Sequence, residues 1–226
     1  MASQQPGNRG GLVARLSGTG RLADDLYLMA HHEVSGKPYL QPRAVGLGLA
    51  GALLAELMLA GKVCLRRDGV VVADRTPPED RLAHSVLGQV LSEHERHAAW
   101  DWLLFLARTA AGDVARRLEQ SGYLTQTSAR RPWRAERWVP VDADCAFAPL
   151  TRARPALGSS GPVTAQSAAL AGLAAACGLG PRLSLYAPPK VRGCLDQVML
   201  QLDPGLRDLI AQTQAAVDSA LLSHRV

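Results

Sequence analysis

Apolar residues recur every three or four positions through most of the chain, which is the spacing that places them on one face of an α-helix. In "RLADDLYLMAHHE", Leu22, Leu26 and Met29 form such a stripe and predict a short helix. Residues 43–60 are apolar at nearly every position, so we expect a long helix buried on most sides and ended by Gly61. Further helices are predicted over residues 79–91, 94–107, 112–121, 163–178, 189–201 and 205–222.

Two segments have the pattern of β-hairpins. In "KVCLRRDGVVVAD" two short β-type runs flank Asp68-Gly69, a strong hairpin-turn signal. "YLTQTSARRPWRAERWVPVD" is extended on both sides of a turn near residues 131–134. We therefore predict a mainly α fold: a single helical domain over residues 21–226, built around a buried apolar helix and carrying two β-hairpins. Residues 1–20 are expected to form a flexible arm.

Composition is that of an ordinary globular domain with a mild basic bias. Hydrophobic residues make up 47% of the 226 residues and charged residues 20%, and the net charge is +5. This charge permits an acidic partner without requiring one. Only three of the 25 basic residues are lysine. Arginine suits bidentate phosphate contacts, but the same preference is typical of a GC-rich bacterial genome.

The cysteines and the hydropathy of the chain indicate in which cellular compartment the protein is expected. The four cysteines are isolated and lack the paired spacing of a zinc site, so we expect reduced thiols. The start, "MASQQPGNRGG", has no apolar core of a signal peptide. The longest apolar stretch, "VGLGLAGALLAELMLAG", contains Glu56 and is short for a membrane-spanning helix. We predict a cytoplasmic protein that meets a membrane, if at all, peripherally on its inner face.

No catalytic arrangement is visible in the sequence. It contains no G-x-x-x-x-G-K-[ST] phosphate loop and no G-x-S-x-G nucleophile motif. Asp24 and Asp25 are adjacent in a predicted helix and should face different neighbours. His94 and His97 have a spacing that could bind a metal, but exposed helix starts often carry such clusters. We expect no enzyme activity, no cofactor and no metal site.

The segment "RRPWRAERWVPV", residues 130–141, concentrates basic and aromatic residues in the second predicted hairpin. Three interpretations remain open. The tryptophans pack the hairpin against the helices or a second subunit, the segment contacts an anionic membrane surface, or it contacts nucleic acid. No nucleic-acid-binding motif accompanies it, so we expect no nucleic-acid partner. The residues of this candidate membrane or self-association hairpin are Arg130, Arg131, Trp133, Arg134, Arg137 and Trp138.

Three ordered segments resemble the Golgi phosphoprotein 3 family: "LADDLYLMAHHEVSGK", "GLAGALLAELMLAGKVCLRRDGVVVAD" and "DVARRLEQSGYLT". The resemblance covers roughly residues 20–222 and is most specific at "AELMLAGKVCL". It implies a single mainly helical domain without catalytic activity that binds phosphatidylinositol 4-phosphate at a membrane surface. In eukaryotic members it also implies a Golgi adaptor that retains glycosyltransferases, and in some members self-association through the second hairpin.

In that family the head group lies near the start of the long apolar helix, held by a tryptophan, an arginine of that helix and an arginine pair. These four positions fall on Gln41, Ala50, Arg108 and Ala111. Basic residues near the substituted positions are able to compensate, so the implied head-group residues here are Gln41, Arg43, Arg108, Arg116 and Arg117. We expect a non-enzymatic peripheral membrane protein that binds a phosphorylated inositol lipid or another anionic phospholipid and forms homo-oligomers through the second hairpin. The alternative is a soluble interaction scaffold on the same fold that has lost lipid binding.

Overall fold

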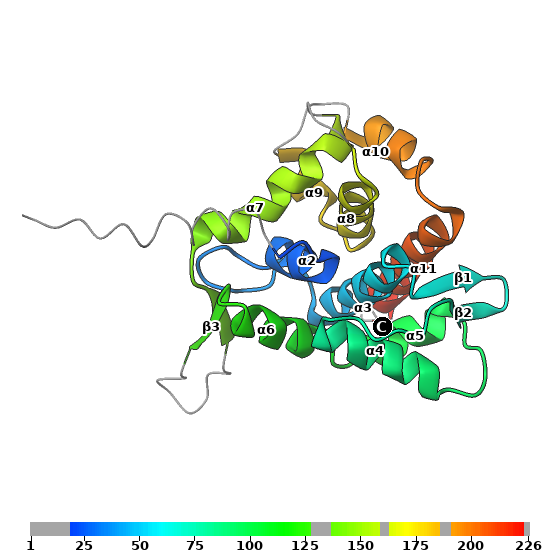
Figure 1. Ribbon diagram of the computed structural model, residues 1–226. Coiled ribbons are helices and arrows are strands. Elements are labelled where there is room, and N and C mark those ends of the chain that lie inside the picture. The colour runs from blue at the N-terminus through cyan, green and yellow to red at the C-terminus, as the bar shows by residue number, and fades with distance from the viewer. Residues whose placement is uncertain (1–18, 128–136, 159–162, 186–190, 224–226) are drawn as a thin grey trace, which may run out of the picture.

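The structure, a computed structural model, describes residues 19–127, 137–158, 163–185 and 191–223 (Figure 1). At its centre lies α3 (Pro42–Leu59), which contacts α2 (Leu22–Ala30), α8 (Ala165–Ala176) and α11 (Pro204–Leu222). These four helices supply most of the hydrophobic core. The mainly α fold class predicted from the sequence is confirmed.

Two further groups of helices flank these four, one beside α3 and the other beside α8 (Figure 1). One consists of α4 (Arg81–Ser92), α5 (Ala99–Leu106) and α6 (Ala110–Gln120), all in contact with α3. The other consists of α7 (Ala143–Ala153), the 3₁₀-helix Arg154–Leu157, α9 (Gly180–Leu185) and α10 (Val191–Met199). In this second group, α7, α9, α10 and the 3₁₀-helix all contact α8.

α3 is long and apolar enough to cross a membrane by length and composition, but 72% of it is buried inside the fold. Its glycines let neighbours approach its backbone closely. A Cβ at Gly48 would lie 2.1 Å from the Cys177 sulfur, and one at Gly46 would lie 2.6 Å from the Ala107 carbonyl oxygen. α3 is therefore a core helix, and its first turns are packed tightly against the connection between α5 and α6.

Both predicted hairpins are present as two-stranded antiparallel sheets. β1 (Val63–Arg66) pairs with β2 (Gly69–Val72), and β3 (Leu124–Thr127) pairs with β4 (Arg137–Pro140). Gly61 has φ +67°, the left-handed conformation expected after the C-terminus of α3. The Asp68-Gly69 turn signal predicted the first hairpin, whereas the extended runs on both sides of residues 131–134 predicted the second.

The predicted helix over residues 94–107 is wrong at its start, because α5 begins only at Ala99. The first hairpin holds the backbone just before this start, because the Val70 N–H donates to the His97 carbonyl over 3.0 Å. α7 and α9 were not predicted. α7 begins where the Asp142 carboxylate accepts hydrogen bonds from the N–H groups of Asp144 and Cys145, a recognisable helix cap.

The second hairpin packs against the loop that leads into α3. Trp138 is half-buried against the hydrophobic core, and the Gly36 backbone closely approaches the Trp138 carbonyl. Trp138 therefore has an intramolecular packing role. Arg137 is exposed at the start of β4. Arg130, Arg131, Trp133 and Arg134 lie outside the described residues, as does the arm up to residue 18, so their predicted roles stay predictions.

Replacing Gly36 with alanine is expected to loosen the second hairpin. Gly36 has φ +62°, and an added Cβ would lie 2.0 Å from the Trp138 carbonyl oxygen. The left-handed conformation alone costs a non-glycine residue about 1–2 kcal/mol, and the collision adds to it. Urea unfolding should show a loss of at least that size. Gly20→Ala is the control, since Gly20 has φ +72° and no atom within 4 Å of its added Cβ. Equal losses in both variants would contradict the packing described here.

Candidate functional site: the start of the central helix

The N-terminus of α3 carries no side-chain cap. Gln41 occupies the cap position in an extended conformation and its side chain makes no capping hydrogen bond, while Pro42 takes the first helical position. The N–H groups of the first turn have no partner in the preceding turn of the helix, and the peptide dipoles place a partial positive charge there. This end of α3 is therefore suited to an anion.

The loop before α3 is held in place by contacts with α9. The Tyr39 hydroxyl donates to Glu33 Oε2 over 2.7 Å, and Arg182 Nη2 donates to Glu33 Oε1 over 2.6 Å. The Arg182 guanidinium also lies over the Tyr39 ring, 3.8 Å from its centroid. The chain thus enters α3 along a fixed path, which positions Gln41 and Arg43.

Two exposed arginines, Arg43 and Arg108, flank the contact between the start of α3 and the end of α5. Arg43 lies one helical turn before Gly46, and Gly46 packs against Ala107, the residue before Arg108. Within the described part of the chain, neither Arg43 nor Arg108 makes a side-chain hydrogen bond or ion pair. Gln41, Arg43 and Arg108 are all exposed, and the surface around this contact between the start of α3 and the end of α5 is here called the α3 entrance.

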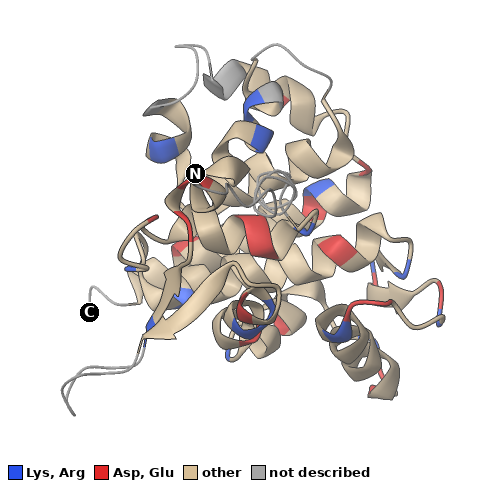
Figure 2. Cartoon of the chain, turned by 60° about the vertical axis from the view of Figure 1, so that its left-hand side comes forward, with Lys and Arg blue, Asp and Glu red and all other residues tan. Residues whose placement is uncertain are grey.

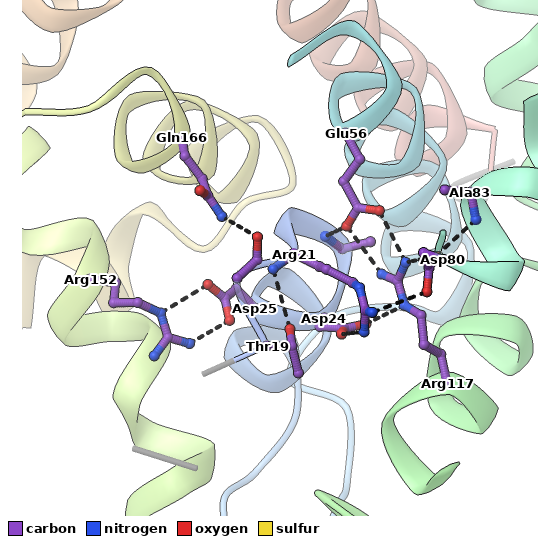
Figure 3. A network of polar contacts seen from close by, with 12 residues as sticks. Thr19, Arg21, Asp24, Asp25, Glu56, Asp80, Ala83, Arg117, Arg152 and Gln166 are labelled. Carbon is purple, nitrogen blue, oxygen red and sulfur yellow. Dashed lines mark hydrogen bonds and ion pairs between the residues drawn. The ribbon is translucent and has the colours of Figure 1, made fainter. Parts of the chain in front are cut away.

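Arg117 does not belong to this surface, which corrects its predicted place among the head-group residues. Its side chain is only 6% exposed and faces three carboxylates (Figure 3). Arg117 Nε donates to Asp24 Oδ1 over 2.7 Å, and its Nη1 donates to Glu56 Oε2 over 3.0 Å and to Asp80 Oδ2 over 2.9 Å. Along α3, Glu56 lies about 22 Å from Gln41. Arg117 is an internal residue of the fold.

Arg116 is exposed on α6 and pairs with Asp113 on the same helix. It lines a cavity of about 520 Å³ between α4 and α6, next to Arg21, Asp80 and Arg117. Arg21 lies 3.4 Å from Asp80. The charges of these arginines are already opposed by carboxylates of the chain, so the cavity has less free positive charge than its arginines suggest.

Arg117, Asp24, Glu56 and Asp80 form a network, here called the Arg117 network. In it, burial and ion pairing have opposite effects on the pKa values of the carboxyl groups. Burial raises the pKa values of Asp24 and Glu56, against the lowering effect of the nearby Arg117 charge. Burial also disfavours the charge of Asp80, but the Ala83 N–H and Arg117 outweigh it and lower the pKa of Asp80. One guanidinium serves three carboxylates, and Arg21 at the edge of the network lies near two of them, Asp24 and Asp80.

Asp24 and Asp25 face different neighbours, as their adjacent places in the helix predicted. Asp24 meets Arg117 of α6, whereas Asp25 pairs with Arg152 of α7 (Figure 3). Sequence reasoning missed these pairs, although a signal existed. Arg117 lies beside Val114 and Leu118 on the buried side of α6, where a charged residue needs a buried partner.

Basic residues elsewhere on the described chain are interspersed with acidic ones. In Figure 2, basic and acidic positions are scattered among the same helices and loops of the chain. The α3 entrance combines exposed arginines, without ion-pair partners among the described residues, with a helix N-terminus that has no side-chain cap.

A comparison with models of protein families identifies the family of this chain. No curated protein matches the chain. The family model described as Golgi phosphoprotein 3 (GPP34) matches residues 22–213, from the start of α2 into α11. The match covers most of the chain and includes α3, both hairpins and the α3 entrance. The protein therefore belongs to the Golgi phosphoprotein 3 family.

Proposed function

We propose that this protein is a peripheral, non-enzymatic membrane protein that binds an anionic phospholipid head group at the α3 entrance. The observation that carries the proposal is the position of two exposed arginines near the uncapped N-terminus of α3. Arg43 lies in its first turn, and Arg108 follows Ala107, which packs against Gly46 of the same helix. Membership of the family supports it, because the family resemblance implies a head-group site near the start of this helix.

A phosphate monoester suits this surface chemically. It presents more negative charge and more acceptor oxygens than the phosphodiester of a simple phospholipid. The N-terminal N–H groups of α3 supply neutral donors, and the two guanidiniums supply charged ones. We therefore infer a preference for a phosphorylated inositol lipid such as phosphatidylinositol 4-phosphate over a singly charged lipid at matched surface charge.

The second hairpin adds to the same membrane-facing edge. β4 packs on the loop that leads into α3, through Gly36 and Trp138, and carries the exposed Arg137. An arginine near an anionic leaflet contributes about 1 kcal/mol of binding free energy. The hairpin thus supplies a second, less specific contact beside the head-group site.

The Arg43→Ala/Arg108→Ala variant is expected to bind vesicles containing phosphatidylinositol 4-phosphate about 30-fold more weakly than the unchanged protein. Two lost arginines at about 1 kcal/mol each account for this factor. Liposome co-sedimentation at low and physiological salt measures it. Vesicles of neutral lipid, and of a simpler anionic lipid at equal charge, test the preference for the phosphate monoester.

The matched control is Arg66→Ala/Arg67→Ala. It removes the same charge from exposed arginines at the first hairpin, beyond the far end of α3, about 27 Å away along the helix. Equal losses of vesicle binding in the two double variants would show that binding depends on net charge alone and would contradict a head-group site at the α3 entrance. No pelleting of the unchanged protein with any vesicle would overturn lipid binding and favour the soluble interaction scaffold.

A further inference from the structure

A separate hollow lies between the end of α4 and α5, with a volume of about 200 Å³. It is lined by five residues: Glu93, His97, Asp101, Trp102 and Phe105. The hollow shares no residue with the α3 entrance. Its lining combines three rings with two carboxylates, a combination typical of sites that recognise organic cations.

The His97 and Phe105 rings each stand nearly perpendicular to the Trp102 indole. The Trp102 indole is the central ring, with the Phe105 ring centroid at 5.8 Å and the His97 ring centroid at 6.1 Å. The planes of Phe105 and His97 are inclined to the indole by 86° and 82°. Trp102 thus contacts two rings that stand nearly perpendicular to it, and all three rings line the hollow, which is here called the aromatic cage.

The cage is built on a rigid support. Trp102 is only 5% exposed and belongs to the hydrophobic core. The His97 backbone is held by the hydrogen bond from the Val70 N–H, and Gly69 approaches the same carbonyl closely. Phe105, in contrast, is 49% exposed, a large fraction for a phenylalanine. A buried, fixed Trp102 ring beside an exposed Phe105 ring is an arrangement that a bound ligand would cover.

The carboxylates give the hollow its charge preference. Glu93 Oε2 lies 3.4 Å from His97 Nε2 at one side. Asp101 is exposed and its carboxylate has no ion-pair partner within the described ranges of the chain. No group of three or more metal-ligating side chains occurs among the described residues, so a metal ion is not the cation that fits. A cation with apolar substituents satisfies both the rings and the carboxylates.

We propose that this cage binds a quaternary ammonium group, as in choline, carried either by a small soluble molecule or by a phospholipid head group. The methyl groups contact Trp102 and Phe105, and the positive charge is balanced by Asp101 and Glu93. The inference is independent of lipid binding at the α3 entrance, because the two sites share no residue.

Choline binding tests the proposal through the indole N–H signal of Trp102 in NMR spectra. We expect saturable shifts of that signal at millimolar choline or tetramethylammonium, and little shift with the neutral choline isostere in which carbon replaces nitrogen. Phe105→Ala and Asp101→Asn should each weaken choline binding about fivefold, which corresponds to about 1 kcal/mol. Equal binding of the neutral isostere, or an unmoved Trp102 signal, would overturn the proposal.

Two control variants separate this site from other effects. Leu104→Ala removes a side chain of the same helix that is 40% exposed and does not line the hollow, and it should bind choline normally. Arg43→Ala/Arg108→Ala should also bind choline normally, even where it loses vesicle binding. Competition by phosphatidylcholine vesicles would identify the lipid head group as the source of the ammonium group, and its absence would identify a soluble molecule. Weakening in Leu104→Ala equal to that in Phe105→Ala would contradict the assigned cage.

Discussion

Replacing Arg117 with methionine is expected to lower the free energy of unfolding by about 3–5 kcal/mol. Methionine keeps most of the volume of the side chain but removes the guanidinium that hydrogen-bonds to Asp24, Glu56 and Asp80. Those carboxylates are then left without their central counter-ion, and Asp24 is fully buried. Urea unfolding followed by circular dichroism measures the loss.

The pH dependence of this loss identifies its cause. Without Arg117, the already raised pKa values of Asp24 and Glu56 should rise further, so the folded state binds more protons than the unfolded state above about pH 4. The stability of the variant therefore increases as the pH falls towards that value. Its deficit relative to the unchanged protein should be smaller at about pH 5 than at about pH 8.

Arg116→Met provides the matched control for Arg117→Met. Arg116 is adjacent on α6, but it is exposed and pairs only with Asp113 among the described residues. Its replacement should change the free energy of unfolding by no more than about 1 kcal/mol, with little pH dependence. A similar loss in both variants, or a deficit in Arg117→Met that is independent of pH, would contradict the buried-charge interpretation.

Asp80→Ala is expected to lower the free energy of unfolding by about 2–4 kcal/mol, the sum of a lost helix cap and a lost charged hydrogen bond. The Asp80 carboxylate accepts from the Ala83 N–H at the start of α4 and from Arg117, each over 2.9 Å. α4 buries few side chains of its own, so this residue is a principal attachment of the helix to the core. Because the pKa of Asp80 is lowered, its contribution is present above the unfolded value of about 4 and is lost as the pH falls below it.

Two further variants divide the effect of Asp80 between capping and pairing. Asp80→Asn keeps a good capping side chain and loses the charge, so it should recover about 1 kcal/mol of the loss in Asp80→Ala. Asp142→Ala removes a comparable cap from α7 and should cost only about 1 kcal/mol, since no ion pair of Asp142 occurs among the described residues. Equal unfolding free energies for Asp80→Ala and Asp142→Ala would contradict a role for Asp80 in binding Arg117.

The fold was most predictable where local chemistry and burial agree. The nearly unbroken apolar run of α3, with Gly61 behind it, predicted both the helix and its end. The predicted start of α5 was wrong because a tertiary contact decided it: the first hairpin uses the His97 carbonyl as an acceptor. α7 was missed although Asp142 caps it, and Pro149 within the helix weakens any helical expectation for that segment.

The candidate site was predictable only in part for a related reason. The start of α3 and Arg108 belong to one region of the fold because Gly46 lets α3 approach the Ala107 backbone, a contact that no local pattern encodes. Sequence spacing alone predicted that Arg117 is free to bind a head group. The structure shows that Arg117 instead pairs with Glu56 and Asp80, which are distant in sequence. The aromatic cage is likewise invisible to sequence reasoning, which placed His97 in a helix that does not extend that far.

The order of the Arg117 contacts along the chain bears on how the protein folds during its synthesis. Asp24, Glu56 and Asp80 all precede their shared counter-ion, and the Asp25 partner, Arg152, comes later still. A nascent chain that ends before Arg117 contains α2 to α5 and the first hairpin but lacks the guanidinium that pairs with Asp24, Glu56 and Asp80. We therefore expect the assembly of α2 on α3 to wait until α6 has left the ribosome.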